Sequence, residues 1–471
     1  MRPLGVGMVH WPALEPLYRE RGCGLSVLEF EPQESWTQAT GPGGGAPAYV
    51  IGADRLAAIA ALPQRKIVHS VALPVGGSVR IGGEQATLVA SVARALDAAW
   101  ASEHLSFNAF DAGGAVFQTG FLMPPRQTPA SVQLAAHNIR EFGATLGVPF
   151  AFETGVNYLK PQSDELTDGR FFAAVAETAD CGILLDLHNL WANERNGREP
   201  VASVLGELPL ERVWEIHLAG GQMFGEYYLD AHSDGIAPEL LDIAAQLIPR
   251  LRNLGAIVFE ILPEHIDGLG LDGVRAQIAE MHALWRLRPP EEIHVMRTPE
   301  VAMPLPRELD AIRSYECGLA NLVHGRATAE GRFADDPGIP VYRTLIDDAR
   351  DGRLARAMRF TITLLLASLG RAAVAQVLSD FRAQSPVEIF SAVEADRFAR
   401  FLRERLDRFA RVSYLAEVLE FEHALVRASL FGTSSRVMWS VDPTVLLAAL
   451  EAGRLPGEMP QLESEMEICA S

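Results

Sequence analysis

The sequence predicts a TIM-type (β/α)8 barrel followed by a mainly α-helical C-terminal domain. Through residue 287, short apolar segments alternate with amphipathic segments of helical period, as in a parallel sheet covered by helices. The apolar segments are almost continuously hydrophobic, which is typical of strands that are buried on both faces. Beyond residue 310 the pattern becomes mainly helical. An open doubly wound sheet is the alternative, but no glycine-rich phosphate-binding loop follows the first expected strand.

Seven segments are expected to form strands. They are residues 25–30, 66–73, 101–110, 148–156, 181–188, 212–220 and 256–262. Amphipathic segments lie between several of them, such as 87–100, 129–147 and 237–255, and we expect these to be helices because their apolar residues recur at helical spacing. Seven or eight strand–helix units in a segment of this length suit a closed barrel better than an open sheet.

Three regions are expected along the chain: the barrel at 1–287, a proline-rich linker at 288–309 and the helical domain at 310–471. The linker is inferred from its prolines and its lack of periodicity. In the last region, residues 353–385 and 394–430 have helical periodicity, and a β-rich segment is expected at 434–453. The last residues, 460–471, are expected to be frayed.

The composition excludes several classes of protein. A formal net charge of −19 argues against a nucleic-acid partner, which needs a basic face. No apolar run is long enough to span a bilayer and the first residues lack a signal peptide's apolar core, so we expect a cytoplasmic protein without membrane contact. The four cysteines are Cys23, Cys181, Cys317 and Cys469. Their spacing matches neither a zinc finger nor a redox motif, so they are expected to be reduced.

Acidic, imidazole and amide side chains recur at or near the ends of the expected strands. They are His69, His104, Glu153, Asp186, His188, Asn189, His217, Asp230, His232 and Glu260. Singly, each would more often be a hydrogen-bonded structural residue or a helix cap. In a barrel, however, the carboxyl ends of the strands meet at one rim. Carboxylates gathered there repel one another and are costly to bury unpaired, so we expect bound cations.

The ligand types limit the choice of metal. Imidazole and carboxylate without cysteine are typical of iron, manganese, zinc or nickel, whereas magnesium takes fewer imidazoles. Ten candidates are too many for one ion, so two or three ions and a bridging carboxylate are expected. A non-haem iron site that binds dioxygen remains open, as does a zinc or manganese isomerase or phosphodiesterase/endonuclease-like hydrolase. A degenerate, non-catalytic peptide-binding barrel is the third alternative.

Six motifs carry a family resemblance. In chain order they are HSVAL, SEHLSF, FETGVNYL, CGILLDLHNLWAN, EIHLAGG and DAHSD. They resemble the multinuclear non-haem iron-dependent oxidative enzymes, an MbnB-like family also catalogued as DUF692 or UPF0276, over roughly residues 1–285. The resemblance implies a TIM barrel that holds two or three iron ions, Fe(II) and Fe(III). It also implies a reaction with dioxygen that modifies a residue of a ribosomally made precursor peptide.

The resemblance assigns the candidate residues to three iron sites. The first consists of His69, His104 and Glu153. Glu153 bridges to a second site with Asp186, His217 and Glu260. The third consists of Asp230 and His232, with His188 or Asn189.

Some residues near these motifs differ in their expected role. Glu103 and Asn157 are expected to orient ligands without binding metal. Relatives commonly have Arg-Asp after the last glutamate, whereas here Ile261 and Leu262 follow Glu260. A transfer of any one relative's reaction to this chain is therefore not implied.

The helical domain carries a resemblance of its own. Tyr414-Leu415 followed by Leu419-Glu420 is similar to a motif of the partner proteins encoded beside these enzymes (MbnC-like, DUF2063-like), which bind the precursor's leader peptide. This implies that enzyme and leader-binding partner are fused. Alternatively, the helices stabilise the barrel or form a homodimer.

Overall fold

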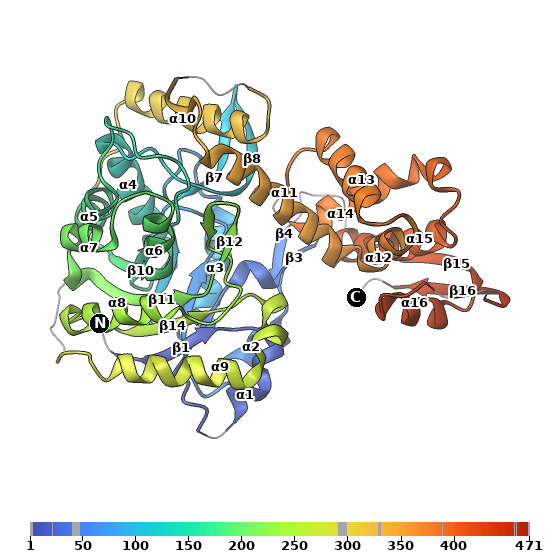
Figure 1. Cartoon of the computed structure of the whole chain (residues 1–471), viewed down its shortest axis with the longest axis horizontal. Helices are drawn as coiled ribbons and strands as arrows, with labels where there is room; N and C mark the ends of the chain where they lie inside the picture. Colours follow the sequence, from blue (N-terminus) through green and yellow to red (C-terminus); the bar gives the residue numbers. More distant parts are fainter. Residues whose placement is uncertain are drawn as a thin grey trace. The chain divides into compact units, whose positions relative to one another are not determined.

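The computed structural model of the chain describes residues 3–20, 22–39, 48–290, 299–327, 331–388, 390–455, 457 and 459–469. They form two compact units (Figure 1). The barrel unit comprises residues 1–35, 51–116 and 122–343. The helical unit comprises residues 36–50, 117–121 and 344–471. In the part of the chain that is described, no helix is both long and apolar enough to cross a bilayer.

The barrel unit is built on a closed sheet of parallel strands, which confirms the predicted TIM-type barrel. The strands follow one another around it in chain order: β1 (Gly5–Val9), β2 (Val27–Phe30), β5 (Arg65–Ser70), β6 (Ala101–His104), β9 (Phe150–Glu153), β10 (Gly182–Asp186), β11 (Val213–Ala219) and β14 (Ala256–Glu260). β1 closes the barrel by pairing with both β14 and β2. Each of the seven expected segments overlaps one of these strands.

Strand β1 was not among the expected strands, because its sequence, GVGMV, is short and contains two glycines. The structure explains one of them. A Cβ at Gly7 would lie 2.1 Å from Cγ1 of Val27 and 2.7 Å from its carbonyl oxygen. Only glycine therefore allows β1 to approach β2 this closely.

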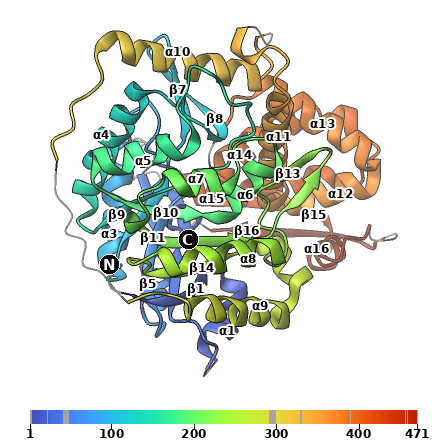
Figure 2. The same ribbon diagram turned by 60° about the vertical axis from the view of Figure 1, so that its left-hand side comes forward.

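Helices surround the strands of the barrel (Figure 2). They are α1 (Glu15–Arg19), α2 (Ala53–Ala60), α3 (Gly83–Ala95), α4 (Pro129–Leu146), α5 (Asp168–Ala179), α6 (Leu187–Arg195), α7 (Val201–Glu207), α8 (Pro238–Leu247), α9 (Pro263–Trp285) and α10 (Pro306–Val323). The ends of α4 show why such segments are helical. The Thr128 hydroxyl accepts a hydrogen bond from the Ser131 backbone N–H, and Gly147 ends the helix in the left-handed conformation, at φ 72°.

Three two-stranded sheets interrupt the alternation of strand and helix. They are β3 (Trp36–Ala39) with β4 (Ala48–Ile51), β7 (Phe107–Ala112) with β8 (Ala115–Met123), and β12 (Gln222–Phe224) with β13 (Tyr227–Leu229). The expected strand 101–110 is thus two elements: β6 ends at His104 and β7 starts at Phe107. Its continuous apolar character concealed this break.

Strand alternation places an apolar plug below the rim. Val27, Ile67, Leu184 and Val258 belong to one buried cluster in the barrel, together with Trp100 and Trp214. Side chains two residues apart on a strand point to the same side. The residues two positions beyond these four are Glu29, His69, Asp186 and Glu260. The polar layer therefore rests directly on the apolar plug.

The boundary between the units differs from the expected linker at 288–309. Residues 291–298 of that segment lie outside the described residues, and α10 starts at Pro306. Helix α10 belongs to the barrel unit, where Glu316 accepts a hydrogen bond from the Ser78 backbone N–H at 2.8 Å. The break falls between Arg343 and Thr344, inside α11 (Gly338–Ala357). The contacts between α10 and the rest of the barrel unit could not be predicted from the proline-rich sequence that precedes this helix.

The helical unit is mainly α-helical, as predicted. After α11 come α12 (Arg359–Leu369), α13 (Arg371–Gln384), α14 (Ser391–Arg403), α15 (Leu415–Phe431), β15 (Ser435–Val441), α16 (Pro443–Glu451) and β16 (Gln461–Ile468). The expected β-rich segment 434–453 thus holds one strand and one helix. The expected fraying of 460–471 is wrong for most of that segment, because β16 pairs with β15.

Candidate metal centre

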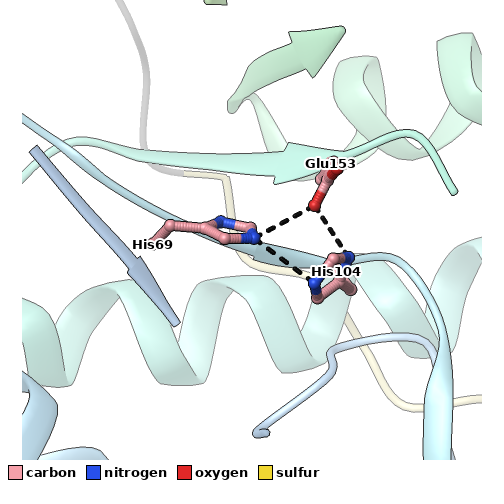
Figure 3. A group of neighbouring side chains, drawn as sticks. All are labelled: His69, His104 and Glu153. Atoms are coloured by element: carbon pink, nitrogen blue, oxygen red, sulfur yellow. Dashed lines mark hydrogen bonds and ion pairs between the residues drawn. The ribbon is translucent and has the colours of Figure 1, made fainter. Parts of the chain in front are cut away.

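The first cluster joins the ends of three neighbouring strands (Figure 3). Oε2 of Glu153, on β9, lies 2.7 Å from Nδ1 of His104, on β6, and 3.1 Å from Nε2 of His69, on β5. The two imidazoles approach to 3.3 Å between their Nε2 atoms. The other nitrogen of His69, Nδ1, lies 2.9 Å from the Ser102 hydroxyl. The three predicted residues therefore present their polar atoms to one point.

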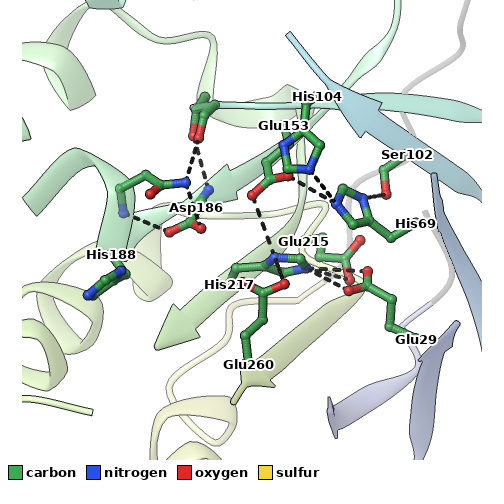
Figure 4. A network of polar contacts seen from close by, with 12 residues as sticks. Glu29, His69, Ser102, His104, Glu153, Asp186, His188, Glu215, His217 and Glu260 are labelled. Atoms are coloured by element: carbon green, nitrogen blue, oxygen red, sulfur yellow. Dashed lines mark hydrogen bonds and ion pairs between the residues drawn. The ribbon is translucent and has the colours of Figure 1, made fainter. Parts of the chain in front are cut away.

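The second cluster lies deeper and shares Glu153 with the first. Ligand atoms of Glu153, Asp186, His217 and Glu260 all lie within 4.8 Å of one another, and all four residues are buried (Figure 4). Nδ1 of His217 is 3.1 Å from Oε1 of Glu260 and 3.8 Å from Oε1 of Glu153. Glu153 thus belongs to both clusters, which is the position that the family resemblance assigns to a bridging ligand.

The third cluster consists of His188, Asp230 and His232. Oδ1 of Asp230 lies 3.0 Å from Nδ1 of His188 and 2.8 Å from Nε2 of His232. Nε2 of His232 is also 3.2 Å from Oε2 of Glu260, which connects this cluster to the second. His232 has a φ of 44°, a conformation that is uncommon for residues other than glycine and is often found at functional sites.

Asn189 has a different position from His188. Its side-chain NH2 donates to Oδ2 of Asp186 at 2.9 Å, and its backbone N–H donates to Oδ1 of Asp186 at 2.8 Å. Asp186 also caps the first turn of α6 in this way. Of the two alternatives expected for the third site, His188 lies in the cluster and Asn189 holds Asp186.

The charges in these clusters need compensation. Burial raises the pKa of Asp186 well above its usual range, and the nearby Asp230 and Glu153 raise it further. Burial would lower the pKa of His104, but Glu153 and Glu103 outweigh it and raise that pKa to about 9. In the same way, Glu260 and Glu29 overcome burial and raise the pKa of His217 well above its usual range. The carboxylates thus draw positive charge to the rim, which either protons or metal ions can supply.

Buried atoms without hydrogen bonds show that the residues fit metal ions. Oε2 of Glu153, Nδ1 of His217, Nε2 of His232 and Oε2 of Glu260 are all buried, and their close contacts do not have the geometry of hydrogen bonds. Buried polar atoms of this kind are rare and need an explanation, such as an ion. Each of them faces another ligand candidate within 4 Å. The donors are nitrogen and oxygen only, as expected from the sequence.

Comparison with known proteins bears directly on this rim. Residues 51–261 match the model of a family described as "RiPP precursor modification enzyme MbnB/TglH/ChrH". The barrel of this chain belongs to that family. The matched residues include all ten candidate residues and end just after Glu260. The family description and the TIM-type barrel together indicate an enzyme.

Curated relatives of the MbnB/TglH/ChrH barrel carry the name UPF0276 protein. One from Anaeromyxobacter sp. is 28% identical over 258 residues, which cover 53% of this chain and 87% of the relative. One from Neisseria meningitidis serogroup B is 30% identical over 189 residues, covering 39% of this chain and 66% of the relative. One from Streptomyces avermitilis is 30% identical over 197 residues, covering 41% of this chain and 40% of the relative. The chain thus spans less than half of the Streptomyces protein.

Solved structures show only remote likeness. D-psicose 3-epimerase from Clostridium cellulolyticum has 9% identity and a TM-score of 0.41, covering 60% of this chain and 99% of the epimerase. Endonuclease IV from Thermus thermophilus has 16% identity and a TM-score of 0.37, covering 59% of this chain and 99% of the endonuclease. At these values the likeness carries no argument about function.

Two buried carboxylates were missed by reading strand ends. Glu29 and Glu215 lie within 4.8 Å of His217 by their ligand atoms, and both are fully buried. Both stand inside apolar strands, LSVLEF and VWEIH, rather than after them. The period of two would have found them, because Glu29 follows Val27 as His69 follows Ile67.

The residues expected to orient ligands lie close to the rim. Glu103 accepts hydrogen bonds from the backbone N–H groups of His104 and Leu73, each at 2.8 Å, and burial raises the pKa of Glu103 to about 7. Asn157 accepts a hydrogen bond from the Leu159 backbone N–H at 3.0 Å and so shapes the loop after β9. At the position of the family's Arg-Asp pair, the Leu262 backbone N–H donates to the His232 carbonyl at 3.0 Å. Here the main chain supports His232.

Proposed function

We propose that the chain is a multinuclear iron- and dioxygen-dependent oxidase that modifies a residue of a ribosomally made precursor peptide. The family supports the peptide substrate. The observation that carries the proposal is the linkage of the three clusters. Glu153 belongs to the first and the second, and His232 of the third lies 3.2 Å from Glu260 of the second. Ions held there would be close neighbours, as a multinuclear reaction requires.

The candidate ligands differ in their exposure to solvent, and we assign their roles accordingly. Iron ions bound at the rim would supply dioxygen activation and electron transfer. The side chains of His104 and His232 are 18% and 23% exposed, whereas that of His217 is 0% exposed. A peptide therefore reaches the centre from the side of His104 and His232, and the second cluster stays shielded from water. Glu153 would hold the deep and the outer ions at a fixed separation.

The helical unit is proposed to bind the precursor's leader segment. Strands β15 and β16 form a two-stranded sheet whose one face packs Val437, Trp439 and Val441 into the core of that unit. Met438, on the other face of β15, is 61% exposed. An extended leader could add to this sheet as a further strand, a common mode of peptide recognition.

Coexpression with a candidate precursor encoded near the gene tests the proposed reaction. We expect mass spectrometry to show a peptide of altered mass with the wild-type chain in air, and unaltered peptide under anaerobic conditions. Mössbauer spectroscopy of the anaerobically purified protein should show iron in more than one environment. Activity that is independent of dioxygen and is supported by zinc or manganese alone would overturn the proposal in favour of isomerase or hydrolase chemistry.

The leader proposal has its own test. Met438→Glu should weaken binding of the precursor to the full chain, measured by calorimetry, and should leave the metal content unchanged. Leu425→Glu, at an exposed position of α15, is the matched control for an added surface charge. Equal precursor affinities of the Met438→Glu variant and wild type would remove β15 as the binding site.

A further inference from the structure

Two carboxylates flank His217 on the side away from the second cluster (Figure 4). Nε2 of His217 lies 3.2 Å from Oε1 and 3.3 Å from Oε2 of Glu29, and 3.6 Å from Oε1 of Glu215. Glu215 is itself held by the indole N–H of Trp100, which donates to its Oε2 at 2.8 Å. His217 is therefore placed between acids below and the candidate ligands above.

This placement selects the tautomer of His217. An imidazole that binds a metal ion has one N–H donor and one nitrogen with a lone pair for the ion, and ionised carboxylates only accept hydrogen bonds. With the hydrogen on Nε2, His217 donates to Glu29, and the lone pair on Nδ1 faces Glu260 and Glu153. With the hydrogen on Nδ1, a lone pair would face Glu29 and Glu215. The first arrangement satisfies the buried groups and presents a free nitrogen to an ion.

The acids need a reason to lie at this depth. Neighbouring positions in the barrel hold Val27, Ile67 and Leu184, so an apolar side chain would pack there. Both acids are fully buried, and burying charge is costly unless the group gains specific partners. The contrast with His69 is informative, because its second nitrogen meets a neutral hydroxyl, that of Ser102, at 2.9 Å. Only His217 has a carboxylate in that role among the imidazoles of the first two clusters in the described chain.

We propose that Glu29 is a positioning residue for the second cluster. It accepts the Nε2 hydrogen of His217 and thereby aims Nδ1 at an ion shared with Glu153, Asp186 and Glu260. Carboxylates behind a ligating histidine fix its orientation and make it a stronger donor. The proposal rests on the proposed metal centre but requires neither the peptide nor dioxygen, so it can be tested separately.

The first test measures Zn²⁺ affinity by competition with a chromophoric chelator, using the full chain after metal removal. Glu29→Leu should weaken one Zn²⁺ site about 10- to 100-fold, the range known for such residues. Glu29→Gln keeps an acceptor oxygen and should weaken that site less. Ser102→Ala is the matched control, because it should affect a site through His69 and leave the His217 site intact.

The second test needs no variant of Glu29. In Zn²⁺-loaded protein labelled with 15N-histidine, the His217 resonances, identified by their loss in His217→Ala, should report hydrogen on Nε2 and metal on Nδ1. Metal on Nε2 would overturn the proposal. Because this measurement uses the wild-type chain, it tests the proposal even if Glu29→Leu does not fold.

The remaining outcomes separate the inference from the proposed function. Wild-type Zn²⁺ affinity in Glu29→Leu would overturn the positioning role alone. Equal losses in Glu29→Gln and Glu29→Leu would also overturn it, because the carboxylate would then be a ligand itself. A wild-type chain that binds metal but leaves the peptide unaltered would overturn the proposed function alone. A chain that binds no metal would overturn both.

Discussion

Glu153 differs from the other candidate ligands because it belongs to two clusters. Burial would raise the pKa of this carboxyl group, but His104 and His69 outweigh it and hold the pKa well below its usual range. Glu153 is therefore an anion at any pH near neutral, whether or not metal is bound. A constant negative charge at the junction of two sites is what a bridging ligand needs.

Removal of Glu153 should lower the metal content more than removal of a ligand that belongs to only one cluster. Glu153→Ala is expected to lower iron content at both the first and the second cluster, whereas His69→Ala should affect only the first. Metal analysis after anaerobic loading, with circular dichroism to confirm folding, measures the difference. Glu141→Ala, which removes an exposed carboxylate from α4, is the control. Full iron content in Glu153→Ala would refute the ligand assignment.

The rim could be predicted from the sequence because its residues stand where apolar runs end. His69, His104 and Glu153 converge as expected, and so do Asp186, His217 and Glu260. The choice between His188 and Asn189 could not be made from spacing, since both follow Asp186 within one helical turn. It depends on the direction of each side chain on α6.

At the scale of single elements, strand β1 shows that a hydrophobic pattern does not predict every strand. Its two glycines lower the apolar signal, yet one of them is required by contact with β2. Strand propensity describes the chain by itself, whereas this glycine is explained by a neighbouring strand. Strand β16 is unexpected for a similar reason: it is rich in glutamate and owes its conformation to pairing with β15, which precedes α16 in the chain.

Substitution at Gly7 tests the close approach of β1 and β2. Gly7→Val should destabilise the chain by about 1–3 kcal/mol or more, because the new side chain overlaps Val27 and its backbone. Urea unfolding followed by tryptophan fluorescence measures this. Gly83→Ala is the control: its added Cβ meets no atom within 4 Å in the described structure, and alanine favours the helix that begins there. Equal stability of the two variants would contradict the packing argument.

Helix α10 is expected to be sensitive to pH through Glu316. Burial raises the pKa of Glu316 to about 7, and the hydrogen bonds from Ser78 only partly offset this. Because the folded pKa exceeds the unfolded value, folding takes up a proton. The stabilising effect is full below the unfolded pKa, near 4.5, and is lost as pH rises to about 7.

Glu316→Gln should therefore gain stability relative to wild type as pH rises from 5 to 8. The relative gain should be roughly 3 kcal/mol at most, from the shift in pKa. Unfolding of both proteins across this range measures it, and Glu308→Gln, on the first turn of the same helix, is the control. A constant difference between Glu316→Gln and wild type at all pH values would show that Glu316 does not titrate on folding.

At the scale of the whole molecule, the units are not consecutive in sequence. Residues 36–50 and 117–121 leave the barrel sequence and belong to the helical unit. There the Trp36 ring is stacked 6.5 Å from that of Phe390, and the Tyr49 ring is 4.5 Å from it. This division could not be predicted from the sequence, because a change of composition along the chain marks only consecutive segments. The linker expected at 288–309 lies where the composition changes, whereas the contacts divide the chain between Arg343 and Thr344.

Truncations test whether the N-terminal segments depend on the C-terminal residues of the helical unit. Removal of residues 344–471 should leave Trp36 and Tyr49 without their partner and yield a chain that aggregates. Removal of 310–471 should be worse, because it also removes α10 and the contact of Glu316 with Ser78. Light scattering and thermal unfolding of the purified proteins compare them. A stable, monodisperse product of the longer deletion would show that α10 is dispensable for the barrel.

The packing of segments that are distant in sequence also affects folding during synthesis. During synthesis, Trp36 and Tyr49 leave the ribosome long before Phe390, against which they pack in the finished molecule. The nascent chain must therefore carry these two aromatic side chains uncovered until the C-terminal helices emerge. Transiently exposed apolar surface of this kind favours association between unfinished chains. Slow translation or a shortage of chaperones should therefore lower the yield of this protein.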